Sequence, residues 1–285
     1  MRGRELKLDQ LLIDIVKYGC IAIMTLVAVF PVYWGVVTSL KPFHEMLRYP
    51  PRFLLEHFTL EHYVGVLSEP LLPFALFYRN SVIVSSATTL LVILVSSFAA
   101  YSLSRLEFPF KDLLANLILF VYLVPRVFLV IPMYLIFGRM HLLNTYWSLI
   151  LSYSAFAMPF CIWLLKGFFD DIPHELEDSA RIDGCTRVGA IFRVILPLSL
   201  SGIVAAAMFS FVLCWNEYLF SNTFVKSNAV RTIAVGMNLY TRGETVAYWG
   251  ELLSSAVMAS IPPIALFVFL QKYLVSGFSA GAVKG

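Results

Sequence analysis

A charged segment, residues 173–197 (PHELEDSARIDGCTRVGAIFRVILP), lies between long apolar runs and carries side chains suited to contact with a partner protein. Pro173 stands where a helix tolerates proline, and acidic residues crowd the first turns, where the helix dipole favours anions. Arg181 lies near the C-terminal end, and Gly184 is placed to leave the helix at positive φ. The sequence therefore predicts a short capped helix that projects into water as a docking element.

The faces of this predicted helix differ in character. Ser179 and Ala180 share one face and are small enough to let another surface approach closely. Glu177 and Arg181 stand at the i,i+4 spacing and predict an ion pair on the helix surface. The predicted docking residues are Glu177, Asp178, Ser179, Ala180, Arg181, Asp183 and Gly184.

The second half of the segment predicts a second helix. Thr186 is a suitable N-cap residue. Spacings of three and four place the apolar residues that follow on one face. These residues are Val188, Ile191, Phe192 and Ile195.

Arg126 follows Pro125 near the middle of the third apolar run. An unpaired arginine at that depth of a membrane costs about 2.5–3.5 kcal/mol, so it must face the bundle interior or a watery cavity. Two interpretations remain open. Arg126 lines a polar path and hydrogen-bonds a sugar hydroxyl or an anionic substituent there, or it forms a structural ion pair with Glu217 or with a carboxylate of a partner subunit.

The fifth apolar run ends in Trp215-Asn216-Glu217-Tyr218. Aromatic residues at the end of a membrane span are usually interface anchors. Asn216 and Glu217 need polar partners near an apolar boundary. A place in a path or at its external gate is what the family resemblance described below implies for Asn216 and Glu217, with a plain helix end as the alternative.

The chain shows no pattern for chemistry of its own. It has no G-x-x-x-x-G-K-[ST] loop to cradle phosphates, so it cannot hydrolyse ATP. No catalytic constellation or metal-ligand cluster is recognisable. The net charge of +3 is too small to indicate a nucleic-acid partner. We expect no catalytic residue, no metal and no bound cofactor.

The composition predicts an all-α integral membrane protein. Apolar residues make up 59% of the chain and charged residues 14%, whereas a soluble chain carries about a quarter charged residues. Mean hydropathy is +0.80. At 285 residues the chain is expected to form one transmembrane domain, 1–285. Six runs approach the roughly 20 apolar residues of a spanning helix: about 18–40, 81–103, 113–137, 147–165, 203–220 and 253–273.

Six spans place both termini on one side. The predicted loops on that side carry more Lys and Arg than those on the other, which favours cytoplasmic termini. Residues 173–197 then lie in the cytoplasm, and the segments at about 41–80 and 221–250 face outward and are able to meet an external partner.

Residues 173–197 resemble the EAA motif of permease subunits from binding-protein-dependent ABC importers. The resemblance rests on Asp178-Ser179-Ala180, with Ser179 in place of the usual alanine, on Asp183-Gly184, and on Ile195-Leu196-Pro197. It extends over nearly the whole chain, which is similar to the shorter permease of maltose-type sugar-uptake systems. The other matching motifs are Asn80-Ser81, AAYSLSRLEFPF at 99–110, Trp215-Asn216-Glu217 and the final GAVKG.

The resemblance implies half of a heterodimeric pore in a bacterial or archaeal inner membrane. The implied partners are a homologous second permease, an ATP-binding subunit dimer that holds ATP and Mg, an extracytoplasmic sugar-binding protein, and membrane lipid. In the family, the glutamate matching Glu177 pairs with a basic residue of the ATPase, and the tail, here 279–285, approaches it.

Two other classes of protein remain as alternatives. An ion- or proton-driven secondary transporter should show inverted repeats or carboxylates inside the membrane, and no Asp or Glu stands in the middle of a predicted span. A membrane-embedded enzyme should show a catalytic constellation.

Overall fold

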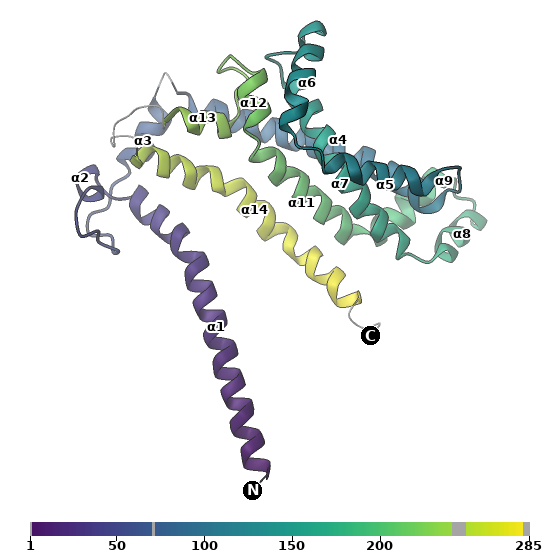
Figure 1. Ribbon diagram of the computed structural model, residues 1–285, viewed down its shortest axis with the longest axis horizontal. Helices are drawn as coiled ribbons and strands as arrows, with labels where there is room; N and C mark the ends of the chain where they lie inside the picture. The colour runs from purple at the N-terminus through teal and green to yellow at the C-terminus, as the bar shows by residue number, and fades with distance from the viewer. Residues whose placement is uncertain (1, 70–71, 241–248, 282–285) are drawn as a thin grey trace. The chain divides into compact units, whose positions relative to one another are not determined.

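The computed structural model describes residues 2–69, 72–240 and 249–281 (Figure 1). The chain forms two compact units, one of Met1–Pro70 with Tyr240–Met258, the other of Leu71–Leu239 with Ala259–Gly285. The prediction of one transmembrane domain stays a prediction. The helices are α1 (Arg2–Ser39), α2 (Phe43–Met46), α3 (Glu61–Ser68), α4 (Phe74–Arg105), α5 (Lys111–Tyr122), α6 (Val127–Arg139), α7 (Tyr146–Asp170), α8 (His174–Ile182), α9 (Arg187–Ala190), the π-helical η1 (Ile191–Ile195), α10 (Leu196–Leu198), α11 (Leu200–Trp215), α12 (Leu219–Phe224), α13 (Ile233–Tyr240) and α14 (Trp249–Gly281).

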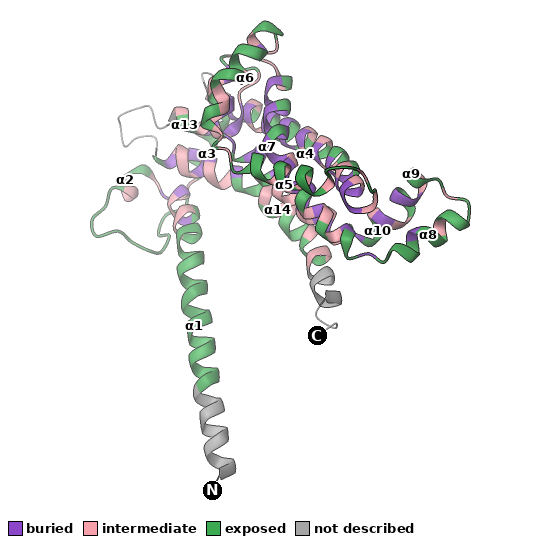
Figure 2. Ribbon diagram, turned by 45° about the vertical axis from the view of Figure 1, so that its right-hand side comes forward, coloured by how far each residue is buried: buried purple, intermediate pink, exposed green. Residues whose placement is uncertain are grey.

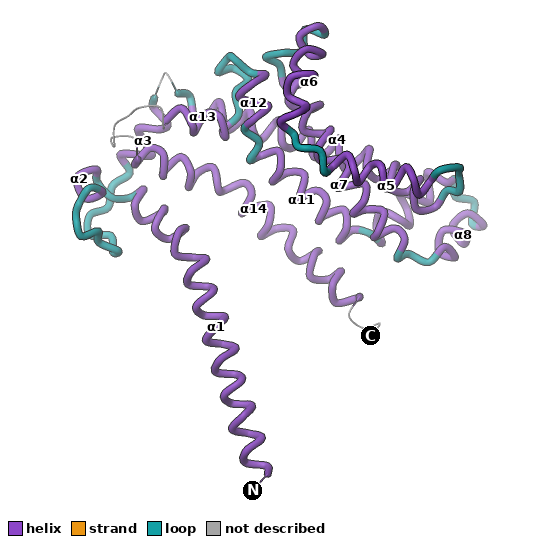
Figure 3. The backbone as a smooth tube through the Cα atoms, viewed as in Figure 1, coloured by secondary structure: helices purple, strands orange, loops and turns teal. Residues whose placement is uncertain are grey.

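The predicted all-α membrane fold is confirmed for the part of the chain described here, in which every regular element is a helix (Figure 3). Four helical segments in these residues are long and apolar enough to cross a membrane, and two strongly bent helix pairs raise the number to six if each pair is one span. The four are Ile13–Ser39, Phe74–Arg105, Tyr146–Asp170 and Trp249–Leu274.

The third predicted span, 113–137, is not one straight helix. α5 and α6 are bent by 96° at a break that contains Pro125. Proline has no backbone N–H to donate, and its ring disfavours helical geometry in the residue before it. Neither half alone has the roughly 20 residues that are needed to cross a membrane. α5 and α6 therefore form a membrane span only as a pair, with a sharp bend between them.

The fifth predicted span, 203–220, has different ends in the structure. α11 ends at Trp215, and Phe220 belongs to the separate helix α12. At the other end, α11 continues from the segment Arg187–Leu198 through a bend of 83°. The span therefore begins and ends earlier than the sequence predicted, and its first residues lead directly out of the charged segment.

The core of the second unit is built on α4 and α7, which pack along each other, with α11 against both. Buried residues lie along α4 and α7 (Figure 2). Ala100, Ala157 and Ala206 are fully buried where these helices meet. The Cys161 thiol lies 3.6 Å from the Ala206 carbonyl oxygen. Small residues at helix contacts let backbones approach closely, which is how membrane helices associate.

The first unit contains α1, whose apolar side chains are mostly exposed along residues 13–39. An apolar helix of spanning length that is exposed within its own unit has its surface available to lipid or to other protein segments. After α1 the chain folds back, and Lys41 donates to the Arg52 carbonyl at 2.5 Å. Its ammonium lies 4.7 Å from the centre of the Trp34 ring, and burial lowers the pKa of Lys41.

Candidate coupling site and candidate pocket

α8 has the ends that the sequence predicted. It begins directly after Pro173, and Gly184 has a φ of +92°. The Cys185 amide donates to the Ala180 carbonyl at 3.0 Å, which satisfies one of the carbonyl groups left over at the helix end. Gly184 therefore provides the left-handed residue that turns the chain from α8 toward α9.

Replacing Gly184 by valine should destabilise this turn by about 1–2 kcal/mol, the usual cost of left-handed geometry for an L-residue. No atom lies within 4 Å of a Cβ built at this position, so the loss comes from backbone conformation and not from a clash. Gly184→Asn is the matched control because asparagine tolerates this conformation. Thermal unfolding of the purified complex measures both, and equal midpoints for the valine variant and wild type would contradict the assignment.

The second helix is capped as predicted, because the Thr186 hydroxyl accepts a hydrogen bond from the Gly189 amide at 3.1 Å. The four apolar residues predicted to share one face differ in burial. Ile191 and Ile195 are buried, whereas Val188 and Phe192 are 56% and 52% exposed. The helix changes from α to π geometry at Ile191.

Glu177 is buried, with 7% of its surface exposed. Its carboxylate accepts a hydrogen bond from the Tyr101 hydroxyl at 2.5 Å and lies 3.6 Å from the Arg105 Nε atom. The predicted ion pair between Glu177 and Arg181 is therefore wrong. Arg181 lies instead 4.0 Å from Asp178. The tertiary fold takes Glu177 out of the surface pairing that its local spacing suggested.

Arg105 connects three elements at this point. It ends α4, faces Glu177 of α8, and donates through Nη2 to the carbonyls of Phe169 at 2.9 Å and Ile172 at 2.7 Å. These carbonyls stand at the C-terminal end of α7, where helix carbonyls lack partners and the dipole favours a cation. No pattern in the sequence singled out Arg105 as a contact residue. Its only signal there was its place at the end of a long apolar run.

The remaining docking candidates lie toward the outside of α8. Asp178, Ser179 and Arg181 are exposed, and the Ser179 hydroxyl donates to the Glu175 carbonyl of its own helix at 2.7 Å. Beside them Ile182 has 86% of its surface exposed. The outer face of α8 therefore combines charges with a large apolar side chain. The other positions, Ala180, Asp183 and Gly184, lie in the last turn of α8 and directly after it.

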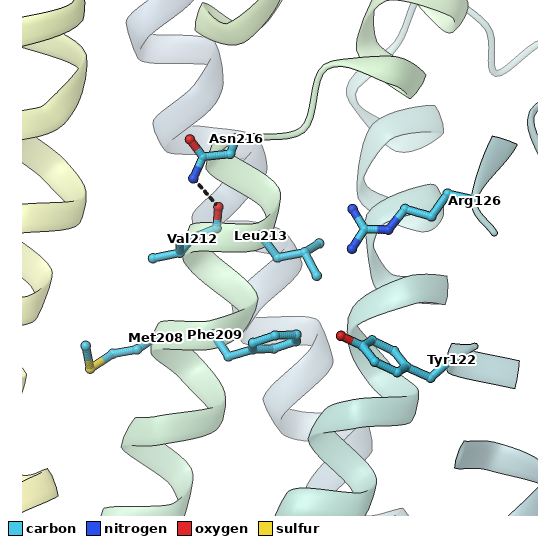
Figure 4. A pocket seen from close by; sticks show the side chains of 7 residues that line it. All are labelled: Tyr122, Arg126, Met208, Phe209, Val212, Leu213 and Asn216. Carbon is cyan, nitrogen blue, oxygen red and sulfur yellow. Dashed lines mark hydrogen bonds between the residues drawn. The ribbon is translucent and has the colours of Figure 1, made fainter. Parts of the chain in front are cut away.

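Arg126 lies at a pocket of about 540 Å³ between the α5–α6 corner and α11 (Figure 4). Its guanidinium points toward the Leu213 and Asn216 side of the pocket and lies 5.6 Å from the centre of the Phe156 ring. The Asn216 amide nitrogen donates to the Val212 carbonyl at 2.8 Å. The pocket is lined by Tyr122, Arg126, Met208, Phe209, Val212, Leu213 and Asn216.

Glu217 caps the N-terminal end of α12 and does not reach Arg126. Its buried carboxylate accepts hydrogen bonds from the backbone amides of Phe220, at 3.0 Å, and Ser221, at 3.3 Å, in the first turn of α12. Within the described residues, no ion pair joins it to Arg126, so the structural ion pair considered as the alternative for Arg126 is not made with Glu217. A part for Pro125, Asn216 or Glu217 in a translocation path stays a prediction.

The comparisons with known proteins agree on one family. The profile of the family described as "Binding-protein-dependent transport system inner membrane component" matches residues 72–280. Over 269 residues the chain is 37% identical to the sulfoquinovosyl glycerol transport system permease protein SmoH of Agrobacterium fabrum, covering 94% of this chain and 93% of SmoH. Over 264 residues it is 34% identical to the trehalose/maltose transport system permease protein MalG of Thermococcus litoralis, covering 92% and 94%.

A solved structure shares the fold. It is the crystal structure of a bacterial ABC transporter involved in the import of the acidic polysaccharide alginate. One of its chains matches with a TM-score of 0.80 at 20% identity, covering 92% of this chain and 96% of that chain. Together with the helical fold and the family match over most of its length, these comparisons show that the chain belongs to the binding-protein-dependent transport system inner membrane component family.

Proposed function

We propose that this chain is a permease subunit of an ATP-driven importer for a sugar or sugar derivative. The observation that carries the proposal is the similarity to SmoH and MalG along nearly their full lengths, since both are permeases of transport systems named for such compounds. The chain forms half of a pore with a homologous second permease. An extracytoplasmic binding protein delivers the cargo, and a separate ATP-binding subunit dimer, which holds ATP and Mg, supplies the energy.

The outer face of α8 and the turn at Gly184 dock onto that ATPase. Four large apolar side chains of this charged segment are exposed, which is typical of a protein contact when they gather on one surface. Buried Glu177 already has partners in its own chain, so Asp178 is the carboxylate of this turn that is offered to a basic residue of the ATPase. The four side chains are Leu176, Ile182, Val188 and Phe192.

The protein is a multi-pass component of a bacterial or archaeal inner membrane, with both termini and the 173–197 segment in the cytoplasm. The surplus of Lys and Arg in the loops assigned to that side supports this orientation. The predicted contact of the 279–285 tail with the ATPase rests on residues of which 282–285 lie outside the described part of the chain.

Reconstituted uptake tests this function. Proteoliposomes would hold this chain, the second permease and the ATPase, with the binding protein outside and radiolabelled trehalose, maltose or sulfoquinovosyl glycerol as cargo. Uptake should require ATP and the binding protein and should survive ionophores. Uptake driven by an ion gradient without ATP would instead identify a secondary transporter.

A further inference from the structure

Arg126 carries a positive charge that no described residue neutralises. Among the described side chains, none of the carboxylates comes within 4.0 Å of its guanidinium, and Glu217, one of the partners considered for it, caps α12. The guanidinium carbon of Arg126 lies over the Phe156 ring, 5.6 Å from the ring centre. A cation over an aromatic ring keeps all its N–H donors available for another ligand.

The surroundings make that free charge costly. The helices on either side of Arg126, α5 and α6, are apolar enough to form a bent membrane span. A cation in such a layer is tolerated when it faces a cavity that holds water or an anion. The guanidinium points into a pocket of about 540 Å³, a size common for small-ligand sites (Figure 4).

The walls of the pocket are suited to a ring-shaped, partly polar molecule. Tyr122 and Phe209 present aromatic side chains, and the Tyr122 hydroxyl points toward Phe209 across the pocket (Figure 4). Met208 and Leu213 add apolar surface. Ligand sites commonly combine apolar walls with a few polar groups that fix orientation. Here the fixed group is a guanidinium, which binds a carboxylate or sulfonate through two parallel hydrogen bonds.

We propose that this pocket binds the anionic substituent of a sugar acid, a carboxylate or sulfonate, with Arg126 as the anion contact and the Tyr122 and Phe209 rings against the sugar. The proposal rests on the proposed import of a sugar or sugar derivative and adds the charge of the cargo. The same anion chemistry is present in a lipid headgroup and in a carboxylate of the second permease, so the test must separate these sources.

The test uses the assembled complex in nanodiscs of phosphatidylcholine and two probes that share a ring and differ in charge. Methyl β-D-glucuronide should raise the thermal midpoint of the wild-type complex, and methyl β-D-glucoside should raise it much less. In R126Q the half-saturating glucuronide concentration should rise about tenfold or more, the usual effect of losing a hydrogen bond to a charged group. R126K should fall between, because lysine cannot bind bidentately.

R139Q is the matched control, since it removes one positive charge from the exposed end of α6 without touching the pocket. Its response should equal that of wild type. Equal stabilisation of wild type by both probes would overturn the proposal without any variant. So would an unchanged glucuronide response in R126Q.

Two further outcomes identify the other anions. If phosphatidylglycerol nanodiscs stabilise the complex through Arg126 and glucuronide adds nothing in phosphatidylcholine, a lipid headgroup occupies the pocket and the proposal fails. If R126Q lowers the midpoint without ligand and removal of a carboxylate from the second permease restores it, Arg126 serves an ion pair and the proposal fails. Failure of the importer function itself would appear separately, as absence of ATP-driven uptake by wild type.

Discussion

Replacing Arg105 by leucine should abolish ATP-driven uptake while leaving insertion into the membrane intact. The substitution leaves the buried Glu177 carboxylate without its cation and removes the donor to the Phe169 and Ile172 carbonyls. Breaking a buried ion pair by removing one partner costs about 3–5 kcal/mol. The Arg105–Glu177 contact is 3.6 Å, a charge contact and not a hydrogen bond, so the lower end of that range is expected.

The loss should act on coupling because Arg105 joins the ends of α4 and α7 to α8. With this connection gone, the Tyr101 hydrogen bond still joins Glu177 of α8 to α4, and α8 keeps its contacts with α9 and η1. A helix that transmits motion between two states must be held firmly by the elements it moves. Uptake per assembled complex, with the thermal midpoint of the same preparation, measures the effect.

Lys111→Leu is the matched control. Lys111 also pairs with a glutamate, but Glu107 is almost fully exposed and such surface pairs contribute little. The double variant Arg105→Leu with Glu177→Leu should recover part of the stability lost in the single variant, because no buried charge is then left alone. Wild-type uptake and an unchanged midpoint in Arg105→Leu would show that the three-element contact has no part in coupling.

Placing any side chain at Gly202 should strongly reduce the amount of folded complex. A Cβ at this position would lie 2.4 Å from the Phe168 ring and 2.9 Å from its Cβ. Those atoms lie at the base of the side chain, so rotation of the ring alone does not clear them. Overpacking of a core costs about 1–3 kcal/mol for a methyl-sized excess and more for a larger one. Gly202→Leu should therefore be more damaging than Gly202→Ala.

Gly167→Ala is the control on the facing helix, since nothing lies within 4 Å of a Cβ built there. It should be neutral or slightly stabilising, because alanine favours a helix over glycine. Adding Phe168→Ala to Gly202→Ala should restore part of the lost midpoint by removing the ring. Yield and thermal midpoint in detergent report both effects. A Gly202→Leu complex with wild-type yield would mean that α7 and α11 do not approach closely at this residue.

The parts of the coupling segment that depend on short-range signals were predictable from the sequence. Pro173 marks the start of α8, Gly184 its left-handed exit, and Thr186 the cap of α9, because each acts through its own backbone or a residue three positions away. The contact between Arg105 and Glu177 joins residues far apart in the chain, and no local pattern encodes it. The i,i+4 spacing pointed instead to Arg181, a choice that burial of Glu177 overrides.

The bend between α5 and α6 could not be predicted from the presence of proline alone. Pro125 lies at a 96° corner, whereas Pro132 lies inside α6 and Pro262 and Pro263 inside α14. Proline removes one hydrogen bond and strains the preceding residue. Whether the helix then continues depends on what packs around it. The sequence identified Arg126 as a misplaced charge, but the pocket walls from α11 became visible only in the structure.

The central claim is that the outer face of α8 contacts the ATPase in the cytoplasm, and cross-linking from Ile182 tests it most directly. A single cysteine at Ile182, 86% exposed, is placed in a cysteine-free chain in membrane vesicles that hold the assembled complex, and a short bismaleimide is added. We expect a cross-linked band of this chain with the ATP-binding subunit, with a yield that changes when ATP is added. A cysteine at Leu54, 73% exposed in the segment predicted to lie outside, should give none. No cross-link from Ile182 in an active complex, or labelling of Ile182 from outside intact cells, would contradict the claim.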